Sequence, residues 1–293
     1  MFSKIKNIKP LREMYIFLRI QLERLKIVLR GGRVREAKYI NIGAGPNFPA
    51  SREWIILEEL VSYNNPFSFI LSKDCVFPVQ SNSIELVYTS HCLEHLDDVT
   101  VARILTESRR VLKDKGLFLV KIPDFEAALN TWRECGESII DNFYDERTLS
   151  TWRNKNIEKT PLNKLSMLFC GFSNDAFGGQ YSNNNKMLVN AYHGPAPVKE
   201  AELDDLLRNH SPHEISAALK NKVLDNEVSF HLNHQNAWSC NELKIVLEQY
   251  DFMPITFCKK EIINKFIFIP GIDTMESNSM YCLAMTTKMG NRI

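Results

Sequence analysis

Short apolar runs alternate with polar stretches through the part of the chain that follows residue 37. The runs that predict strands are Lys38–Ile42, Trp54–Leu57, Ser68–Ser72, Ile84–Thr89 and Leu117–Ile122. Between the last two runs, apolar residues at three- and four-residue steps predict a helix over Val99–Leu112, which Lys115-Gly116 is expected to end. Each strand run is almost continuously apolar, as in strands that are covered on both faces. The pattern therefore predicts an α/β fold around a parallel sheet.

The regular alternation lapses after residue 124 and returns near residue 236. Residues 125–235 contain helical fragments and turn-forming Gly, Pro and Asn clusters, and they are too many for a simple loop. We therefore expect a mostly helical insertion that covers a substrate site. Beyond it, Ser239 and Glu242 form the pattern of a capping box at the start of a helix. Two further apolar runs follow, around Ile255–Cys258 and Met280–Thr286.

The N-terminal segment has a pattern of its own. Residues 11–30 carry apolar side chains at helical spacing, and Gly31-Gly32 ends the predicted helix. The chain is therefore expected to consist of a basic amphipathic helix in 1–37, a core of 38–124 and 236–293, and the insertion 125–235.

Composition narrows the class of protein. The chain has 293 residues, of which 44% are hydrophobic and 24% charged, so it can bury a core without disulfides or a structural metal. The seven cysteines are scattered and form no C-x-x-C pair. Collagen, wholesale disorder and a disulfide scaffold are excluded, and we expect reduced thiols in the cytoplasm.

Charge is distributed unevenly along the chain. Residues 1–38 carry a net charge of +8 and the rest carries −7, which together give the overall +1. The apolar stretch Met14–Leu29 is interrupted by charged residues, so it is neither a membrane span nor a signal peptide. The basic helix could contact an anionic membrane surface, dock on the body or bind a partner. We do not expect a nucleic-acid partner, because no aromatic and basic interleaving supports one.

Candidate chemistry gathers at the carboxyl ends of the predicted strands. Gly43 and Gly45 follow the first strand, Glu58 ends the second, Asp74 follows the third, and Ser90-His91 closes the fourth. Open α/β sheets bind ligands at this edge, where glycines let the backbone approach a ligand and an acid can accept hydrogen bonds from ribose hydroxyls.

Taken in order, these segments resemble the class I S-adenosylmethionine-dependent methyltransferase superfamily, in particular its type 11-like branch. The segments that carry the resemblance are Asn41–Asn47, Trp54–Glu58, Asp74–Pro78, Ser83–Val87, Ser90–Leu96 and Arg109–Gly116. The similarity extends over about 38–124 and resumes over 236–287. It implies a doubly wound, Rossmann-like sheet of seven strands with the last one antiparallel.

The resemblance also implies S-adenosylmethionine as cofactor and a set of residues that hold it. Asn41, Gly43 and Gly45, with Ala44 between the glycines, would line the methionine end. Glu58 would bind the ribose, and Asp74 would accept from the adenine amine beside the Cys75 amide. Ser90 and His91 would lie under the methyl donor.

The chain departs from the family pattern at three places. Asn stands at position 41 where an acid is frequent, and Asn47 replaces the third glycine. Only eight residues separate Gly45 from Trp54, so the usual crossover helix must be shortened to a turn. This disfavours a nicotinamide-dependent oxidoreductase, whose diphosphate needs the N-terminus of that helix.

Methyl transfer is an in-line displacement, which mainly requires alignment of the acceptor and exclusion of water. A hydroxyl acceptor benefits from a base, and we predict His95 as base or acceptor-orienting group; a helix-start histidine that only fixes the loop is the alternative. His91 and His95 are four apart, but no third ligand follows from the sequence, so no metal is expected.

The expected function is methylation of a sugar, glycan or small-metabolite acceptor, with oxygen as the methylated atom. The acceptor class follows from the resemblance alone. A methyltransferase-like fold that acts as a binding or scaffold protein is the alternative.

Overall fold

The computed structural model of this chain describes residues 18, 22, 37–45, 48, 51–58, 67–71, 74–135, 165, 168–169, 200–220, 234–258 and 279–286. Apart from Leu18 and Leu22, the predicted N-terminal helix lies outside these residues, so its contact with an anionic membrane stays a prediction. Much of the predicted insertion also lies outside them.

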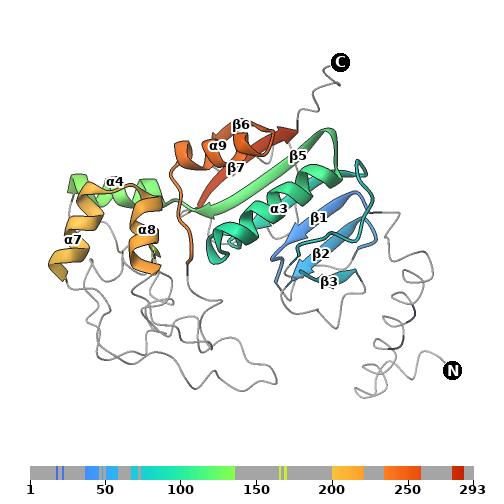
Figure 1. The fold of residues 1–293 in the computed structure, drawn as a ribbon, viewed down its shortest axis with the longest axis horizontal. Helices are drawn as coiled ribbons and strands as arrows, with labels where there is room; N and C mark the ends of the chain where they lie inside the picture. The colour runs from blue at the N-terminus through green and yellow to red at the C-terminus, as the bar shows by residue number, and fades with distance from the viewer. Residues whose placement is uncertain are drawn as a thin grey trace, which may run out of the picture.

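One seven-stranded sheet forms the centre of the molecule (Figure 1). Its strands are β1 (Tyr39–Ile42), β2 (Trp54–Glu58), β3 (Ser68–Ile70), β4 (Ile84–Ser90), β5 (Leu112–Pro123), β6 (Phe252–Cys258) and β7 (Ser279–Thr286). They lie in the order β3-β2-β1-β4-β5-β7-β6. The pairs among β1 to β5 are parallel, whereas β7 is antiparallel to both β5 and β6. The predicted seven-stranded sheet with an antiparallel last strand is confirmed.

Among the first five strands, two boundaries differ from the prediction by more than one residue. β3 ends at Ile70, where its pairing with Glu58 of β2 stops, rather than at Ser72. β5 begins at Leu112 instead of Leu117, because Leu112 already pairs with Ile84 of β4. Lys115-Gly116 therefore lies within β5 and does not end the preceding helix.

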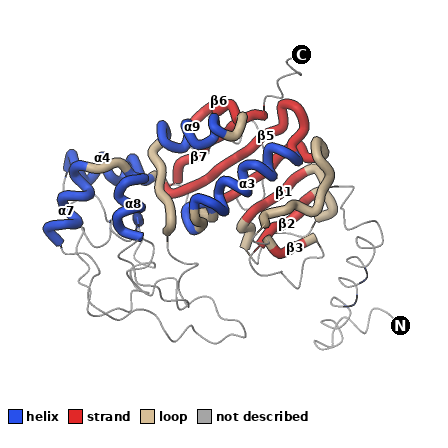
Figure 2. Tube along the Cα trace, in the orientation of Figure 1, coloured by secondary structure: helices blue, strands red, loops and turns tan. Residues whose placement is uncertain are grey.

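Helices α3 (Asp98–Val111) and α9 (Cys240–Gln249) cover the same face of the sheet (Figure 2). Asp97 caps α3 by accepting a hydrogen bond from the Thr100 N–H, which moves the helix start one residue ahead of the predicted Val99. The predicted capping box of α9 is confirmed, since Ser239 and Glu242 bond each other's backbone N–H groups.

The main core lies between this face and its helices. It includes side chains from β1, β2, α3 and α9: Ile40, Ile42, Ile55, Leu57, Ile104, Leu105, Leu243 and Leu247. A smaller cluster on the same sheet contains Trp54, Leu86, Tyr88, Leu119, Tyr281 and Leu283. Each fully buried aliphatic side chain of this kind contributes about 1.5–3 kcal/mol to stability.

A helical unit lies beyond the end of β5 and consists of α4 (Phe125–Cys135), α7 (Glu200–Asn209) and α8 (Pro212–Lys220) (Figure 1). The Arg133 guanidinium of α4 donates hydrogen bonds to the carbonyls of Leu207 and His210, 2.9 and 2.6 Å away. These bonds satisfy carbonyls that the end of α7 leaves unpaired, so α4 and α7 are held together.

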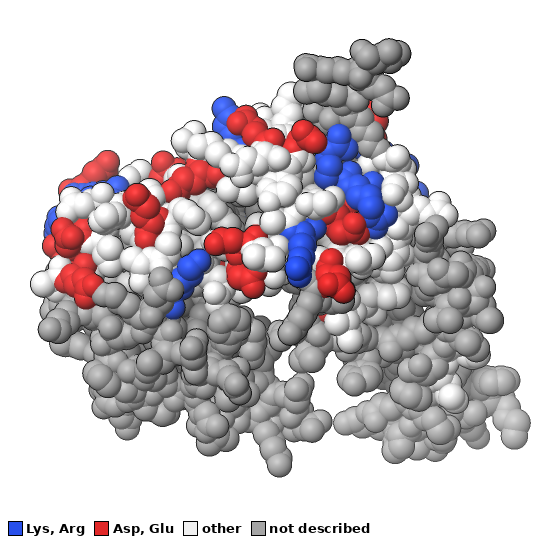
Figure 3. Space-filling model, in the orientation of Figure 1, with Lys and Arg blue, Asp and Glu red and all other residues white. Residues whose placement is uncertain are grey.

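Among the described residues, no helix combines the length and apolar character that crossing a membrane requires. On the face drawn in Figure 3, the described Lys and Arg side chains are interspersed with Asp and Glu. The described part of this face therefore offers no single-sign patch for a polyanion or an anionic surface.

Candidate functional site

The two glycines after β1 occupy backbone conformations that favour glycine, with φ of +72° at Gly43 and +71° at Gly45. They differ in what surrounds them. A β-carbon at Gly43 would lie 2.6 Å from the Cys92 Cβ, whereas one at Gly45 would meet no atom within 4 Å. Gly43 thus packs against the segment after β4, and Gly45 borders open space at the carboxyl edge of the sheet.

Glu58 is joined directly to the glycine loop. The Gly45 N–H donates a 2.5 Å hydrogen bond to Glu58 Oε1, and the parallel pairing of β1 with β2 places both at the same edge. The described residues between these strands, 43–45, 48 and 51–53, contain no helix, in line with the shortened crossover. Two of the residues expected to hold the cofactor are therefore in contact.

Asp74 and Cys75 lie in the connection after β3. Asp74 is exposed, whereas Cys75 is buried in the main core, and burial raises the pKa of its thiol. The backbone of Cys75 has a φ of 53°, so the chain turns sharply between an exposed acid and a buried thiol.

The connection that Asp74 begins is anchored to α3. The Glu107 carboxylate accepts hydrogen bonds from the Phe77 N–H at 2.9 Å and from the Arg110 guanidinium at 2.6 and 2.7 Å. Arg110 also donates to the carbonyls of Phe77 and Val79. Burial disfavours ionisation of Glu107, but these hydrogen bonds outweigh it and hold the pKa below its usual 4.5.

The segment after β4 bends at His91, whose φ is +48°. The His91 N–H donates to the Lys121 carbonyl, and its Nε2 lies 2.9 Å from Ser279 Oγ at the start of β7. The ring's other nitrogen, Nδ1, lies 3.3 Å from Glu94 Oε1. His91 is thus held between two strands of the sheet and the short helix that follows it.

That short helix, the 3₁₀ turn η1 (Leu93–His95), carries a fully buried carboxylate. Burial disfavours the charged form of Glu94, but His91 first, and then His95 and His234, favour it, so its pKa lies below 4.5. Neither Glu94 oxygen makes a hydrogen bond to a described residue, although His91 is close. An anionic carboxylate inside the fold is therefore surrounded by imidazoles.

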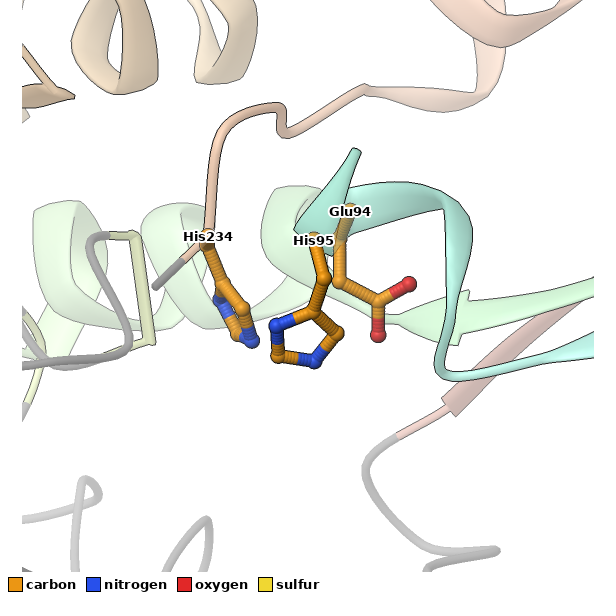
Figure 4. Close-up of side chains that lie close together, drawn as sticks. All are labelled: Glu94, His95 and His234. Carbon is orange, nitrogen blue, oxygen red and sulfur yellow. The ribbon is translucent and has the colours of Figure 1, made fainter. Parts of the chain in front are cut away.

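His95 and His234 lie edge to face beside Glu94, with ring centroids 4.6 Å apart (Figure 4). His234 Nδ1 lies 2.5 Å from the Leu168 carbonyl, which can only accept, so Nδ1 carries the proton and Nε2 keeps its lone pair. Burial, and then His95, lower the pKa of His234 to about 3, which keeps the ring neutral. Ligand atoms of the three residues all lie within 4.8 Å of one another.

Main-chain hydrogen bonds bring His234 to this place. The Glu94 carbonyl accepts from the N–H groups of Gln235 and Asn236, at 2.6 and 3.0 Å. The side-chain amide of Asn236 also donates a hydrogen bond to the Leu96 carbonyl, at 2.7 Å. The chain returning from the predicted insertion is therefore docked on η1.

The sequence analysis placed no third ligand near His91 and His95. The structure brings His234 and Glu94 to His95, while His91 turns toward Ser279 and Glu94. The signal that could have indicated His234 is its position two residues before the core resumes, where the chain must return to the sheet edge.

The described residues fit the cofactor that the resemblance implies. The buried Asn41 side chain on β1 has an amide oxygen without a hydrogen-bond partner among them. Gly45 leaves open space, and the Glu58 carboxylate stands beside it. The roles of all the residues assigned to the site stay predictions: Asn41, Gly43, Ala44, Gly45, Glu58, Asp74, Cys75, Ser90, His91 and His95.

Comparison with known proteins gave one family match, to the family described as "Methyltransferase domain", over residues 55–120. A search of curated proteins gave no significant match. The chain is similar to a solved SAM-dependent methyltransferase from Aquifex aeolicus, with 11% identity, coverage of 89% of each chain and a TM-score of 0.35.

Two further solved structures have similar scores. One is a 1,6-didemethyltoxoflavin-N1-methyltransferase from Burkholderia thailandensis, with 9% identity, coverage of 92% of this chain and 78% of that one, and a TM-score of 0.38. The other is the carbon methyltransferase CurJ, with 11% identity and a TM-score of 0.35. The match to CurJ covers 87% of this chain but only 50% of CurJ.

The family match can be placed on the described fold. Residues 55–120 run from β2 through β5, the part of the chain that contains Glu58 and the Glu94–His95 pair. The seven-stranded sheet with antiparallel β7 is the one that the resemblance implies. Residues 55–120 of this chain therefore match the methyltransferase domain family, and the described sheet has the Rossmann-like fold that the resemblance implies.

Proposed function

We propose that this protein transfers the methyl group of S-adenosylmethionine to a hydroxyl oxygen of a sugar, a glycan or another small metabolite. The observation that carries the proposal is the carboxyl edge of the sheet. There, the glycine loop bonded to Glu58 lies next to a segment that presents histidines. The contact between Gly43 and Cys92 joins the two, because Cys92 directly precedes η1.

The cofactor would be held by the residues of β1 and β2. Glu58 would accept hydrogen bonds from the ribose hydroxyls while its Oε1 fixes the Gly45 amide. Asn41 offers a buried amide oxygen to the polar methionine end. Bound S-adenosylmethionine supplies an electrophilic methyl group, so the protein has to align the acceptor with it and exclude water.

The acceptor would be handled by His95. A neutral imidazole takes a proton from a hydroxyl best when a nearby anion stabilises the imidazolium that forms. Glu94 is such an anion, since it is buried and its pKa is lowered. His95 is half-buried and so can be reached from outside. The helical insertion, next to this segment through Gln235 and Asn236, would cover the acceptor.

Calorimetric titration tests the cofactor. S-adenosylmethionine and S-adenosylhomocysteine should bind with micromolar affinity, and NADH should not bind. Glu58→Ala should weaken binding by about 1–3 kcal/mol through lost hydrogen bonds. Glu53→Ala is the matched control, because Glu53 precedes the same strand and pairs with Lys38 at 2.7 Å. Equal cofactor affinities of Glu58→Ala and Glu53→Ala would show that Glu58 does not bind the cofactor.

Turnover tests the acceptor. Release of S-adenosylhomocysteine should be measured with sugars, sugar nucleotides and small hydroxylated metabolites. His95→Ala should lower kcat much more than cofactor affinity, whereas His210→Ala, at an exposed histidine, should change neither. An equal loss of both in His95→Ala would make this residue structural. A folded protein that binds neither S-adenosylmethionine nor its product would instead be a scaffold.

A further inference from the structure

Three donor groups from two distant segments converge beside the glycine loop. Glu94 and His95 come from η1, and His234 comes from the chain that returns to the core before α9 (Figure 4). Their ligand atoms lie within 4.8 Å of one another. We propose that Glu94, His95 and His234 bind a divalent first-row transition-metal ion.

The carboxylate gives the first independent support. The Glu94 side chain has no exposed surface, and neither of its oxygens makes a hydrogen bond within the part of the chain that the structure describes. A buried carboxylate left in this state is costly unless a cation or hydrogen-bond donors compensate its charge. His91 approaches Oε1 to 3.3 Å, which leaves Oε2 for a ligand.

The imidazoles of His95 and His234 give the second independent support for a metal site. A histidine binds a metal through a nitrogen lone pair, and the other ring nitrogen commonly donates to a carbonyl that fixes the tautomer. His234 meets this requirement, because Nδ1 donates to the Leu168 carbonyl and Nε2 keeps the lone pair. Both His95 and His234 are partly exposed, so an ion can reach them.

Hydrogen bonds to backbone carbonyls hold the two segments together. The Glu94 carbonyl accepts from Gln235 and Asn236, and the Leu96 carbonyl accepts from the Asn236 side chain. Three hydrogen bonds thus fix the two residues that follow His234 against the segment that carries the other two donors. Such preorganisation reduces the ordering that metal binding would otherwise require.

The donor set indicates the kind of ion. Two imidazole nitrogens and one carboxylate oxygen suit zinc, and they also form the triad that holds divalent iron with open positions. Magnesium prefers oxygen donors and an octahedral shell, so it should bind poorly here. Three protein ligands leave at least one position for water or for another oxygen.

An ion at this place would also bear on the proposed reaction, and this consequence rests on the proposed function. An acceptor hydroxyl bound at the open position would have a lowered pKa and a fixed orientation. His95 would then act through the ion rather than take the proton itself. Metal binding itself does not depend on methyl transfer.

The competing description is an ion pair without metal. Glu94 and His91 at 3.3 Å, with Ser279 behind the ring, form a network that could serve the fold alone. The two descriptions predict different results for His234→Ala. The substitution lowers the affinity for a metal ion only if His234 is a ligand of that ion.

The test is calorimetry and visible spectroscopy on the full chain after chelator treatment and dialysis. Zn²⁺ should bind with a stoichiometry of one, Co²⁺ should give the absorption bands of a low-coordinate site, and Mg²⁺ should not compete. His234→Ala should weaken Zn²⁺ and Co²⁺ binding by at least about 10–100-fold, the loss usual for residues that merely support a ligand. His210→Ala, at a histidine 3.6 Å from exposed Glu214, is the matched control.

The outcomes are separable. No stoichiometric Zn²⁺ or Co²⁺ binding, or equal binding by the His234→Ala and His210→Ala variants, overturns the proposal. Circular dichroism of each variant verifies its fold, and Glu94→Gln provides a second ligand variant if His234→Ala does not fold. S-adenosylhomocysteine titration of the metal-free protein tests the cofactor site separately, so failure of the metal site leaves the methyltransferase proposal standing.

Discussion

Gly43 and Gly45 allow the packing of the glycine loop to be tested with a matched pair of substitutions. Both residues have φ near +70°, so an alanine at either position has the same backbone penalty of about 1–2 kcal/mol. The gain from a stiffer unfolded chain, about 0.4–1 kcal/mol, is also common to both. Neither contribution enters the difference between the two variants.

What remains in that difference is the clash at Gly43. Its β-carbon would lie 2.6 Å from Cys92 Cβ and 2.7 Å from Cys92 Sγ, whereas the one at Gly45 meets nothing within 4 Å. Overpacking of a closed site costs about 1–3 kcal/mol. We therefore expect Gly43→Ala to be less stable than Gly45→Ala by about 1–3 kcal/mol.

Urea unfolding followed by circular dichroism measures the difference, provided that the slopes of the two transitions agree. Cys92→Gly removes both clashing atoms, so the double variant Gly43→Ala/Cys92→Gly should lose most of the extra penalty in a double-mutant cycle. Equal stabilities of the two alanine variants, or no coupling with Cys92, would refute the close contact between Gly43 and Cys92. Under the proposed function, Gly45→Ala should instead weaken S-adenosylhomocysteine binding, because its methyl group enters the open space.

Three further changes test other parts of the structure. Glu107→Gln should reduce the free energy of unfolding most above about pH 5 and least in acid, because the stability that the lowered Glu107 pKa provides is lost as the pH falls through that pKa. Parallel pH profiles of stability for the variant and the unmodified protein would contradict this assignment. Ser239→Ala should lower stability by about 1 kcal/mol in urea unfolding, since it removes the α9 cap, and Ser239→Thr should retain most of it. Asn236→Ala should leave the Leu96 carbonyl unpaired, costing about 1–3 kcal/mol, and should speed hydrogen exchange at residues 234–236; unchanged exchange would argue against the docking.

The positions of the first five strands followed from local patterns, whereas the seven-stranded sheet with an antiparallel last strand came from the resemblance. Continuous apolar runs predicted the strands, and the strand-end rule brought Gly45 and Glu58 to one edge, where they are now bonded. The predicted strand boundaries were wrong where pairing with a neighbouring strand, and not the local sequence, decides them. Leu112 joins β5 because Ile84 lies opposite, a contact that no window around residues 112–116 contains.

The histidine cluster could not be predicted for a related reason. His95 was singled out because it follows β4, but its neighbour His234 lies far along the chain and has no motif around it. Hydrogen bonds between distant segments, such as those of Gln235 and Asn236 to Glu94, fix that approach. Spacing rules find ligands on one helix or loop, whereas this set spans two segments that meet through main-chain contacts.

The bond between Asn236 and Leu96 joins residues 140 positions apart, and this separation constrains the order of events in folding. The loop it closes includes α3, β5 and residues 125–235. Closing so long a loop is entropically unfavourable until the intervening elements have condensed. The cluster of Glu94, His95 and His234 should accordingly be completed late, after β1 to β5 have paired. A nascent chain that ends before residue 234 would expose Glu94 without the segment that covers it.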